Sequence, residues 1–153
     1  MVHHKNRYFT FSVEFADGQA APTGAQAVIA QVRASIIDLH GDYGAGCTMP
    51  SLSLRFFDPS SGVCNVRVDR EFAEMTRASI VVVTIIDKRE VRLRVLHMAG
   101  SMRKCKLVLR KCLDAHLRKR LEGWAQVSLP PREKQNALNV HREAVTELDR
   151  TQL

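Results

Sequence analysis

The 153-residue chain lacks several features that would assign it to a common functional class. Its longest apolar run is far shorter than the ~20 residues that a membrane-spanning helix needs. Its first residues lack the apolar core of a secretory signal. Its four cysteines form no C-x₂₋₄-C pair, which argues against a zinc site: Cys47, Cys64, Cys105 and Cys112. These absences predict a reduced intracellular protein without a metal or cofactor of its own.

Catalytic signatures are also scarce. The chain has neither a glycine-rich phosphate loop of P-loop spacing nor a nucleophile elbow. A free-standing enzyme could use His97 with Cys105, oriented by Asp42 or Asp69. However, His97 has the strand parity of the core-facing Leu93, which favours a hydrogen-bonded core histidine. The acids near the start of the second predicted helix could hold Mg²⁺, but they equally suit the helix dipole.

Positive charge is the most informative feature that is present. The net charge is +7, whereas residues 129–153 carry equal numbers of basic and acidic groups. Residues 103–120 contain a single acid, Asp114, and a dense set of bases: Arg103, Lys104, Lys106, Arg110, Lys111, Arg118, Lys119 and Arg120. Such a block repels itself unless an anion lies against it, so it predicts a nucleic-acid partner. An anionic membrane or a merely solvated basic face are the alternatives.

The order of the predicted elements indicates the fold. Apolar residues at every second position predict strands, and apolar residues three or four apart predict helices. We expect strands over 8–15, 52–57, 63–68, 81–86 and 91–98, helices over 23–40, 70–79 and 101–123, and a loop over 41–46. This order is typical of an α+β protein, a ferredoxin- or RNA-recognition-motif-like α/β sandwich with an antiparallel sheet and an added basic C-terminal helix. We expect a ribonucleoprotein-like α/β domain over 1–128 and a helical tail over 129–153.

Strand parity predicts an arginine-rich sheet face. If Phe9, Leu54, Val66 and Leu93 face the helices, one set of residues shares the opposite face: Tyr8, Arg55, Phe57, Asn65, Arg67, Arg92 and Arg94. Arginines on such a face suit phosphates or an acidic protein partner. The third strand has no aromatic residue, which argues against base stacking there.

A second candidate anion site lies at the start of the last long helix. The run from Gly100 to Lys104 opens that helix with Gly100 and Ser101, which leaves backbone N–H groups free. Arg103 and Lys104 follow in the first turn, where the helix dipole disfavours cations. A phosphodiester bound there would relieve this conflict. An ordinary serine N-cap with solvated basic residues is the alternative.

Several strings occur in the order in which one known family has them: Met1-Val2, Lys5 to Tyr8, Gly41 to Gly44, Phe56 to Pro59, Gly62, Arg67, Arg70-Glu71 and Leu96 to Cys105. Together they closely resemble the Pop-five family, a small protein subunit of ribonuclease P and of its relative ribonuclease MRP. The resemblance covers roughly residues 1–115. One departure is Ala99 to Met102, where the family more often has Ser-Gly-Thr-Ile.

The resemblance implies a non-catalytic RNA-binding subunit of the ribonuclease P/MRP particle, which supports 5′-leader removal from precursor tRNA and ribosomal RNA processing. It implies that catalysis and Mg²⁺ belong to the RNA component. The implied partners are that catalytic RNA, precursor tRNA, a barrel-shaped subunit of about thirty kilodaltons and other subunits of the particle, with no membrane. The implied location is the nucleus or nucleolus in a eukaryote and the cytoplasm in an archaeon. A generic basic protein- or RNA-interaction module is the alternative, and a stand-alone enzyme on a ferredoxin-like fold is another.

Candidate site residues come from both lines of reasoning. The resemblance and the charge block together predict RNA contacts at Lys5, Arg7, Tyr8, Gly100, Ser101, Arg103, Lys104, Lys106, Arg110 and Lys111. The resemblance and the sheet parity predict contacts to RNA or to a protein partner at Gly41, Asp42, Tyr43, Gly44, Arg55, Arg67, Arg92 and Arg94.

Overall fold

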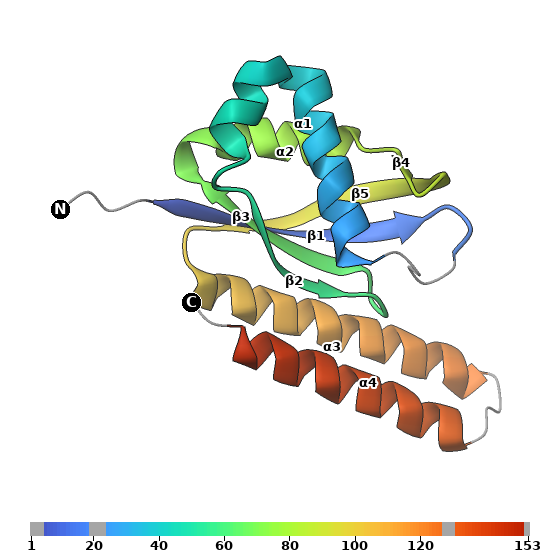
Figure 1. The fold of residues 1–153 in the computed structure, drawn as a ribbon. Coiled ribbons are helices and arrows are strands. Elements are labelled where there is room, and N and C mark those ends of the chain that lie inside the picture. Colours follow the sequence, from blue (N-terminus) through green and yellow to red (C-terminus); the bar gives the residue numbers. More distant parts are fainter. Residues whose placement is uncertain (1–4, 19–23, 127–130, 152–153) are drawn as a thin grey trace.

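A five-stranded antiparallel sheet forms the centre of the computed structural model, which describes residues 5–18, 24–126 and 131–151 (Figure 1). The strand order is β2-β3-β1-β5-β4. The strands are β1 (Asn6–Phe15), β2 (Ser53–Asp58), β3 (Val63–Asp69), β4 (Ile85–Ile86) and β5 (Arg89–Ala99). The four longer strands have the ferredoxin-like arrangement, with the first strand central and the hairpin at one edge. This confirms the predicted fold class.

Two helices cover one face of the sheet, α1 (Ala25–Thr48) and α2 (Ala73–Val82), the latter preceded by a short 3₁₀ helix, η1 (Arg70–Phe72). Their apolar sides pack on alternate residues of the strands, so Phe9, Phe11 and Val66 are fully buried between the two layers. Ser35 in α1 donates a hydrogen bond to the carbonyl oxygen of Ser79 in α2 (2.9 Å). The hydrophobic core between the sheet and these two helices is the larger of two cores in the described structure.

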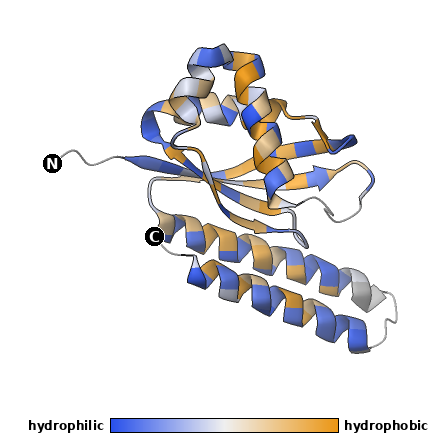
Figure 2. Cartoon of the chain, viewed as in Figure 1, coloured by the Kyte–Doolittle hydropathy of each residue, from blue (hydrophilic) through white to orange (hydrophobic). Residues whose placement is uncertain are grey.

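The other face of the sheet is covered by α3 (Met102–Gln126), and α4 (Pro131–Arg150) packs along α3 (Figure 1). A second core lies here, in which Leu109, Leu113 and Leu148 are buried. In Figure 2 the hydrophobic residues of both helices alternate with hydrophilic ones, as expected of amphipathic helices. The predicted tail helix therefore exists over 131–150, and α3 extends three residues beyond its predicted end at Gly123. The division into a domain of residues 1–128 and a tail stays a prediction.

The expected loop over 41–46 is wrong. Helix α1 is interrupted at Gly41, whose φ of 61° and ψ of −161° lie outside the helical region, and the chain then continues as a second helical segment to Thr48. Glycine adopts this conformation without steric cost, so the predicted break is at the correct residue. Gly44 lies in the next turn, where a Cβ would lie 2.2 Å from the Cβ of His40. Close packing across the kink therefore requires a glycine there.

The expected strand over 81–86 is also mostly wrong. Helix α2 continues through Val82, and only Ile85 and Ile86 form a strand. The β-branched run suits a strand, but Ser79 and Ile80 are fully buried against the first core, so tertiary packing keeps this stretch helical. Asp87 and Lys88 have φ values of 50° and 63° and form the two-residue turn into β5.

Two β-bulges change the predicted parity of the sheet. In β2 the pairing shifts between Leu54 and Phe56, so Phe56 joins the second core and Phe57 packs against the first. In β5 the pairing shifts at Leu96, which places His97 opposite Thr10. The predicted positions of Phe57 and His97 are therefore wrong, because one extra residue in a strand reverses the face of those that follow.

No helix within the described ranges combines the length and hydropathy that crossing a bilayer requires.

Candidate nucleic-acid interface

The first strand and the start of α3 meet at one end of the sheet. Tyr8 pairs with Ala99, and the Arg7 guanidinium approaches Gly100 so closely that a Cβ on this glycine would lie 3.2 Å from Nη1. A side chain at position 100 would therefore push Arg7 away. The Lys104 N–H points at the Ser101 hydroxyl in a long contact of 3.5 Å, in the manner of a serine N-cap. The fold thus brings together Arg7, Gly100 and Ser101, three residues for which RNA contacts are predicted; the RNA contacts themselves stay a prediction.

Exposed cations continue from this point along α3. Arg103 and Lys104 are exposed in the first turn, Lys111 in the third, and Arg118 and Lys119 follow further along the helix. None of these five forms an ion pair among those found in the described part of the chain. The neighbouring Leu107 is 59% exposed, which adds an apolar patch to the cationic ridge. This combination suits phosphates with some contact to sugars or bases.

Two of the predicted RNA-binding residues on α3 form hydrogen bonds with α4. The Arg110 guanidinium donates to both carboxylate oxygens of Asp149 (2.9 and 2.8 Å), and Lys106 Nζ donates to the Asp149 carbonyl oxygen (3.2 Å). Further along the two helices, His141 Nε2 lies 3.1 Å from the Asp114 carboxylate. Lys106 and Arg110 thus lie on the predicted helix but already have an anionic partner.

The expected arginine-rich sheet face is present by register but not open, because α3 lies across it. Asn65 is fully buried there: its Nδ2 donates to Cys105 Sγ (2.8 Å) and to the Phe9 carbonyl oxygen (2.9 Å). The arginines lie around this covered centre. Arg67 pairs with Tyr8 across the strands and is half-buried, Arg55 is half-buried at the β2 bulge, and Arg92 and Arg94 are exposed on β5.

The segment from Gly41 to Gly44 lies apart from the start of α3, on the other side of the sheet (Figure 1). Asp42 and Tyr43 are exposed there, the latter by 74%. The two predicted contact regions therefore form two separate surfaces. Lys5 belongs by position to the surface at the start of α3, since it directly precedes β1. Its carbonyl oxygen accepts a hydrogen bond from the Arg70 N–H (2.8 Å).

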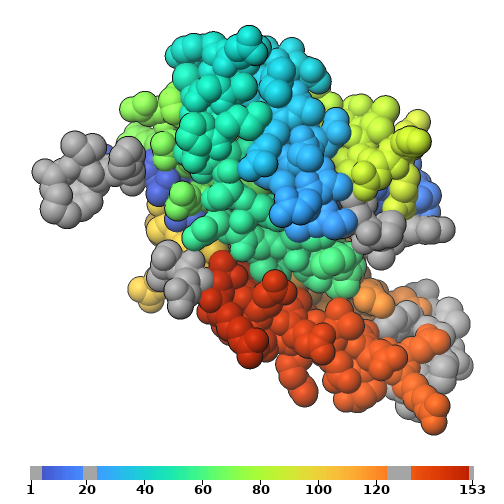
Figure 3. All heavy atoms as spheres, in the orientation of Figure 1, coloured from blue at the N-terminus to red at the C-terminus, as the bar shows by residue number. Residues whose placement is uncertain are grey.

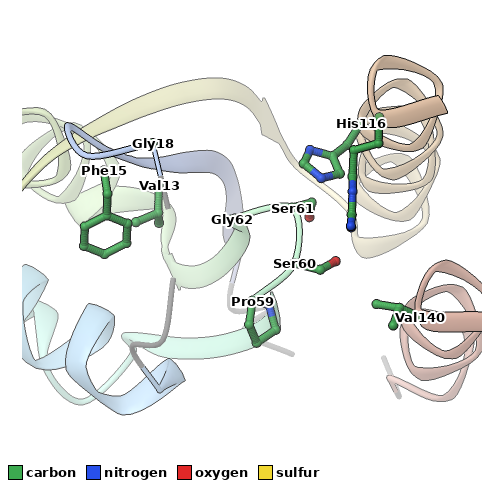
Figure 4. Close-up of a pocket in the computed structure, with 10 residues that line it drawn as sticks. Val13, Phe15, Gly18, Pro59, Ser60, Ser61, Gly62, His116 and Val140 are labelled. Atoms are coloured by element: carbon green, nitrogen blue, oxygen red, sulfur yellow. The ribbon is translucent and has the colours of Figure 1, made fainter. Parts of the chain in front are cut away.

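A cavity of about 540 Å³ opens between the β2–β3 turn and the two C-terminal helices (Figure 4). His116 of α3 forms one side, and the turn from Pro59 to Gly62 forms another. Arg120 of α3 also lines the cavity. Burial, and then the positive charge of Arg120, lower the pKa of His116. The turn itself is held by Asp58, whose carboxylate accepts hydrogen bonds from the backbone and side chains of Ser60 and Ser61.

The Cys105 environment bears on the enzyme alternative. Burial raises the pKa of this thiol, and its Sγ contacts Asn65 and Thr10. These are the surroundings of a buried thiol and not of a thiolate nucleophile. Asp42, one of the two acids that could orient a histidine, lies on α1 across the sheet. Within the described residues, no three His, Cys, Asp or Glu side chains are grouped so that they could hold a metal ion.

Comparison with known proteins identifies the family. The model described as the Rpp14/Pop5 family matches residues 7–110, which is more than half of the chain. The chain belongs to the Rpp14/Pop5 family. The match begins at Arg7, the second residue of β1, includes the other four strands and ends within α3 at Arg110, so α4 lies outside it.

Individual relatives agree with this family. The chain is 26% identical over 117 residues to the ribonuclease P/MRP protein subunit POP5 of Schizosaccharomyces pombe, covering 70% of this chain and 84% of the relative. It is 28% identical over 119 residues to the probable ribonuclease P/MRP protein subunit POP5 of Arabidopsis thaliana (73% and 79%), and 28% over 105 residues to ribonuclease P protein component 2 of Pyrococcus horikoshii (69% and 82%). These names describe protein subunits or components of an enzyme, in agreement with the predicted accessory, non-catalytic subunit.

A solved structure supports the fold of the Rpp14/Pop5 chain. A chain in the cryo-EM structure of yeast ribonuclease MRP superposes with a TM-score of 0.53 at 16% identity, covering 78% of this chain and 96% of that one. This likeness concerns the arrangement of the backbone. The resemblance predicted from the ordered sequence strings is confirmed at the level of the family by the family model and not by this likeness.

Sequence reasoning missed the interhelical contacts of this family member. Asp149 was counted only in the neutral charge of the tail, because no local pattern links it to Lys106 and Arg110 about forty positions earlier. The cavity beside His116 was missed for the same reason. The helical spacing of Leu138, His141, Val145 and Leu148 indicated a buried side of α4, and the structure buries Leu148 but leaves Leu138 39% exposed.

Proposed function

We propose that this Rpp14/Pop5 chain is a non-catalytic RNA-binding subunit of a ribonuclease P/MRP ribonucleoprotein, and that it binds RNA through the start of α3. In this role it supports removal of the 5′ leader from precursor tRNA and, in an MRP particle, ribosomal RNA processing. Mg²⁺ belongs to the RNA component. The surface from Gly41 to Gly44 is assigned to protein neighbours in the particle, among them a barrel-shaped subunit. A nuclear or nucleolar location fits the eukaryotic relatives, and a cytoplasmic one fits the archaeal relative.

The observation that carries the RNA-binding proposal is the convergence of Arg7 with the first turn of α3. The Arg7 guanidinium lies against Gly100, and Arg103 and Lys104 are exposed in the turn that follows. The start of a helix offers backbone N–H groups and a positive dipole end, where cations are otherwise unfavourable. Cations from two elements gathered at such a point complement the phosphates of a folded RNA.

A charge-matched pair of variants tests this surface. Arg103→Ala with Lys104→Ala removes two cations from the start of α3, and Arg33→Ala with Arg77→Ala removes two exposed cations from α1 and α2. We expect the first variant to weaken binding of a labelled precursor tRNA about tenfold and to lower the slope of log K against log salt by about 2. The second should change both quantities little.

The measurement also separates the subunit from a generic basic module. Such a module responds to total charge alone, so both variants would lose affinity equally, and heparin would compete as well as RNA. Equal losses in the two variants would therefore overturn the assignment of the start of α3 as the RNA-binding surface.

A further inference from the structure

The contact between Asp149 and α3 has the composition of a phosphate site. Asp149 presents two carboxylate oxygens to Arg110 and its carbonyl oxygen to Lys106, so one residue offers three oxygens to two cations. A phosphodiester group offers a similar set of anionic oxygens to arginine and lysine. The position of Asp149 near the end of α4 strengthens the likeness, because the last carbonyl groups of a helix lack helical partners and carry the negative end of the dipole.

The surroundings of this contact leave room for a ligand. A cavity of about 270 Å³ lies at it, lined by Arg103, Lys106, Leu107, Arg110 and Asp149. Arg103 belongs to the RNA-binding surface proposed above, so the cavity extends that surface along α3. The ion pair is largely exposed to solvent, with 48% of the Arg110 side chain and 59% of the Asp149 side chain accessible. Exposed ion pairs of this kind hold their partners weakly, so a polyanion can compete for them.

Other contacts hold α4 in place independently of this ion pair. Leu148 is fully buried, Ala137 and Ala144 are nearly so, and His141 lies against Asp114. Arg110 and Lys106 have long flexible side chains, so they can leave Asp149 while α4 stays docked. In Figure 3 α4 covers much of α3 from the side that is shown, as a helix that shields the α3 surface would.

We propose that Lys106 and Arg110 form a second RNA phosphate site, which Asp149 occupies in the free protein, so that α4 and RNA compete for the same two cations. This proposal rests on the proposed function, since it concerns the same RNA. The carboxylate of Asp149 acts as a stand-in for phosphate and weakens binding of RNAs that cannot displace it.

Replacement of one side chain tests the competition. Asp149→Asn keeps the shape of the side chain and removes its charge, and Glu143→Gln removes the same charge from an exposed position on α4. With a labelled precursor tRNA as probe, we expect Asp149→Asn to bind about three- to tenfold more tightly and to steepen the salt slope by about 1, because Arg110, freed from the carboxylate, contacts phosphate directly, whereas Lys106 keeps its carbonyl partner. Glu143→Gln should change the affinity much less.

A further variant ties the gain to the two cations. If Lys106→Ala with Arg110→Ala is added to Asp149→Asn, the gain should disappear. The inference is overturned if Asp149→Asn and Glu143→Gln have the same effect, or if the gain persists without the two cations. Failure of the proposed function gives a different result, since Arg103→Ala with Lys104→Ala would then change the affinity no more than Arg33→Ala with Arg77→Ala, whatever Asp149 does.

Discussion

At the scale of single residues, a few positions fix how the sheet meets its neighbours. Asn65 is fully buried between the sheet and α3. The hydrogen bonds that its side-chain amide donates to β1 and to Cys105 hold α3 in register on the sheet. Gly62 closes the β2–β3 turn beside Val13. The sequence shows a polar residue in the middle of a strand and a glycine in a turn. It does not show which residues they contact, because these partners come from distant segments of the chain.

Gly62→Ala should destabilise the protein strongly. Gly62 has a φ of 65°, and a Cβ there would lie 2.4 Å from the carbonyl oxygen of Val13, which belongs to a central strand and cannot move aside. We expect the free energy of unfolding to fall by about 2–3 kcal/mol in urea denaturation. Gly123→Ala is the matched control, since nothing lies near that position in α3, and it should raise stability by about 0.5–1 kcal/mol. Equal effects would contradict the described turn.

His116 should make stability depend on pH. Its folded-state pKa is lowered, first by burial and then by Arg120, so the unfolded chain binds this proton more readily. The free energy of unfolding therefore falls as the pH drops below the ordinary value of 6.5. We expect urea midpoints to show a smaller loss of stability between pH 7.5 and pH 5 in His116→Gln than in the unchanged protein. The same loss in both would show that His116 titrates alike in the folded and unfolded chain.

At the scale of elements, periodicity predicted most helices and strands but not their ends. Strand β1 was predicted from the alternation of Phe9, Phe11 and Val13, and α3 from the helical spacing of Cys105 and Leu109. Each pattern was sufficient because it reflects one buried face of the element. The bulges in β2 and β5 were not predictable, since an inserted residue leaves no mark in local composition. The stretch 81–86 has strand propensity, but its start belongs to α2 because packing outweighs propensity there.

Helix α4 should depend on Leu148 for its position. This side chain is fully buried against α3, whereas Leu138 on the same helix is 39% exposed. Leu148→Ala should lower the free energy of unfolding by about 2–4 kcal/mol, and Leu138→Ala by less than about 1 kcal/mol. Hydrogen exchange should show the loss of protection first in residues 131–150. If both variants lost equal stability, the described docking of α4 would be wrong.

At the scale of the whole molecule, one sheet separates two surfaces to which the proposed function gives different roles. Helices α1 and α2 on one side carry the exposed segment at Asp42 and Tyr43, and α3 on the other carries the cationic ridge. The total charge and the block at 103–120 predicted the second surface from the sequence. Its partial cover by α4 could not be predicted, because the balanced charge of residues 129–153 conceals the contacts of Asp149 with Lys106 and Arg110.

The central claim is that this chain works as an RNA-bound subunit through the start of α3. Tagged protein recovered from its own cells, followed by sequencing of the attached RNA, tests it most directly. We predict one abundant structured RNA that carries precursor-tRNA cleavage activity, and its loss in the Arg103→Ala, Lys104→Ala variant but not in Arg33→Ala, Arg77→Ala. Recovery of random RNA, of none, or of equal RNA with both variants would contradict the claim.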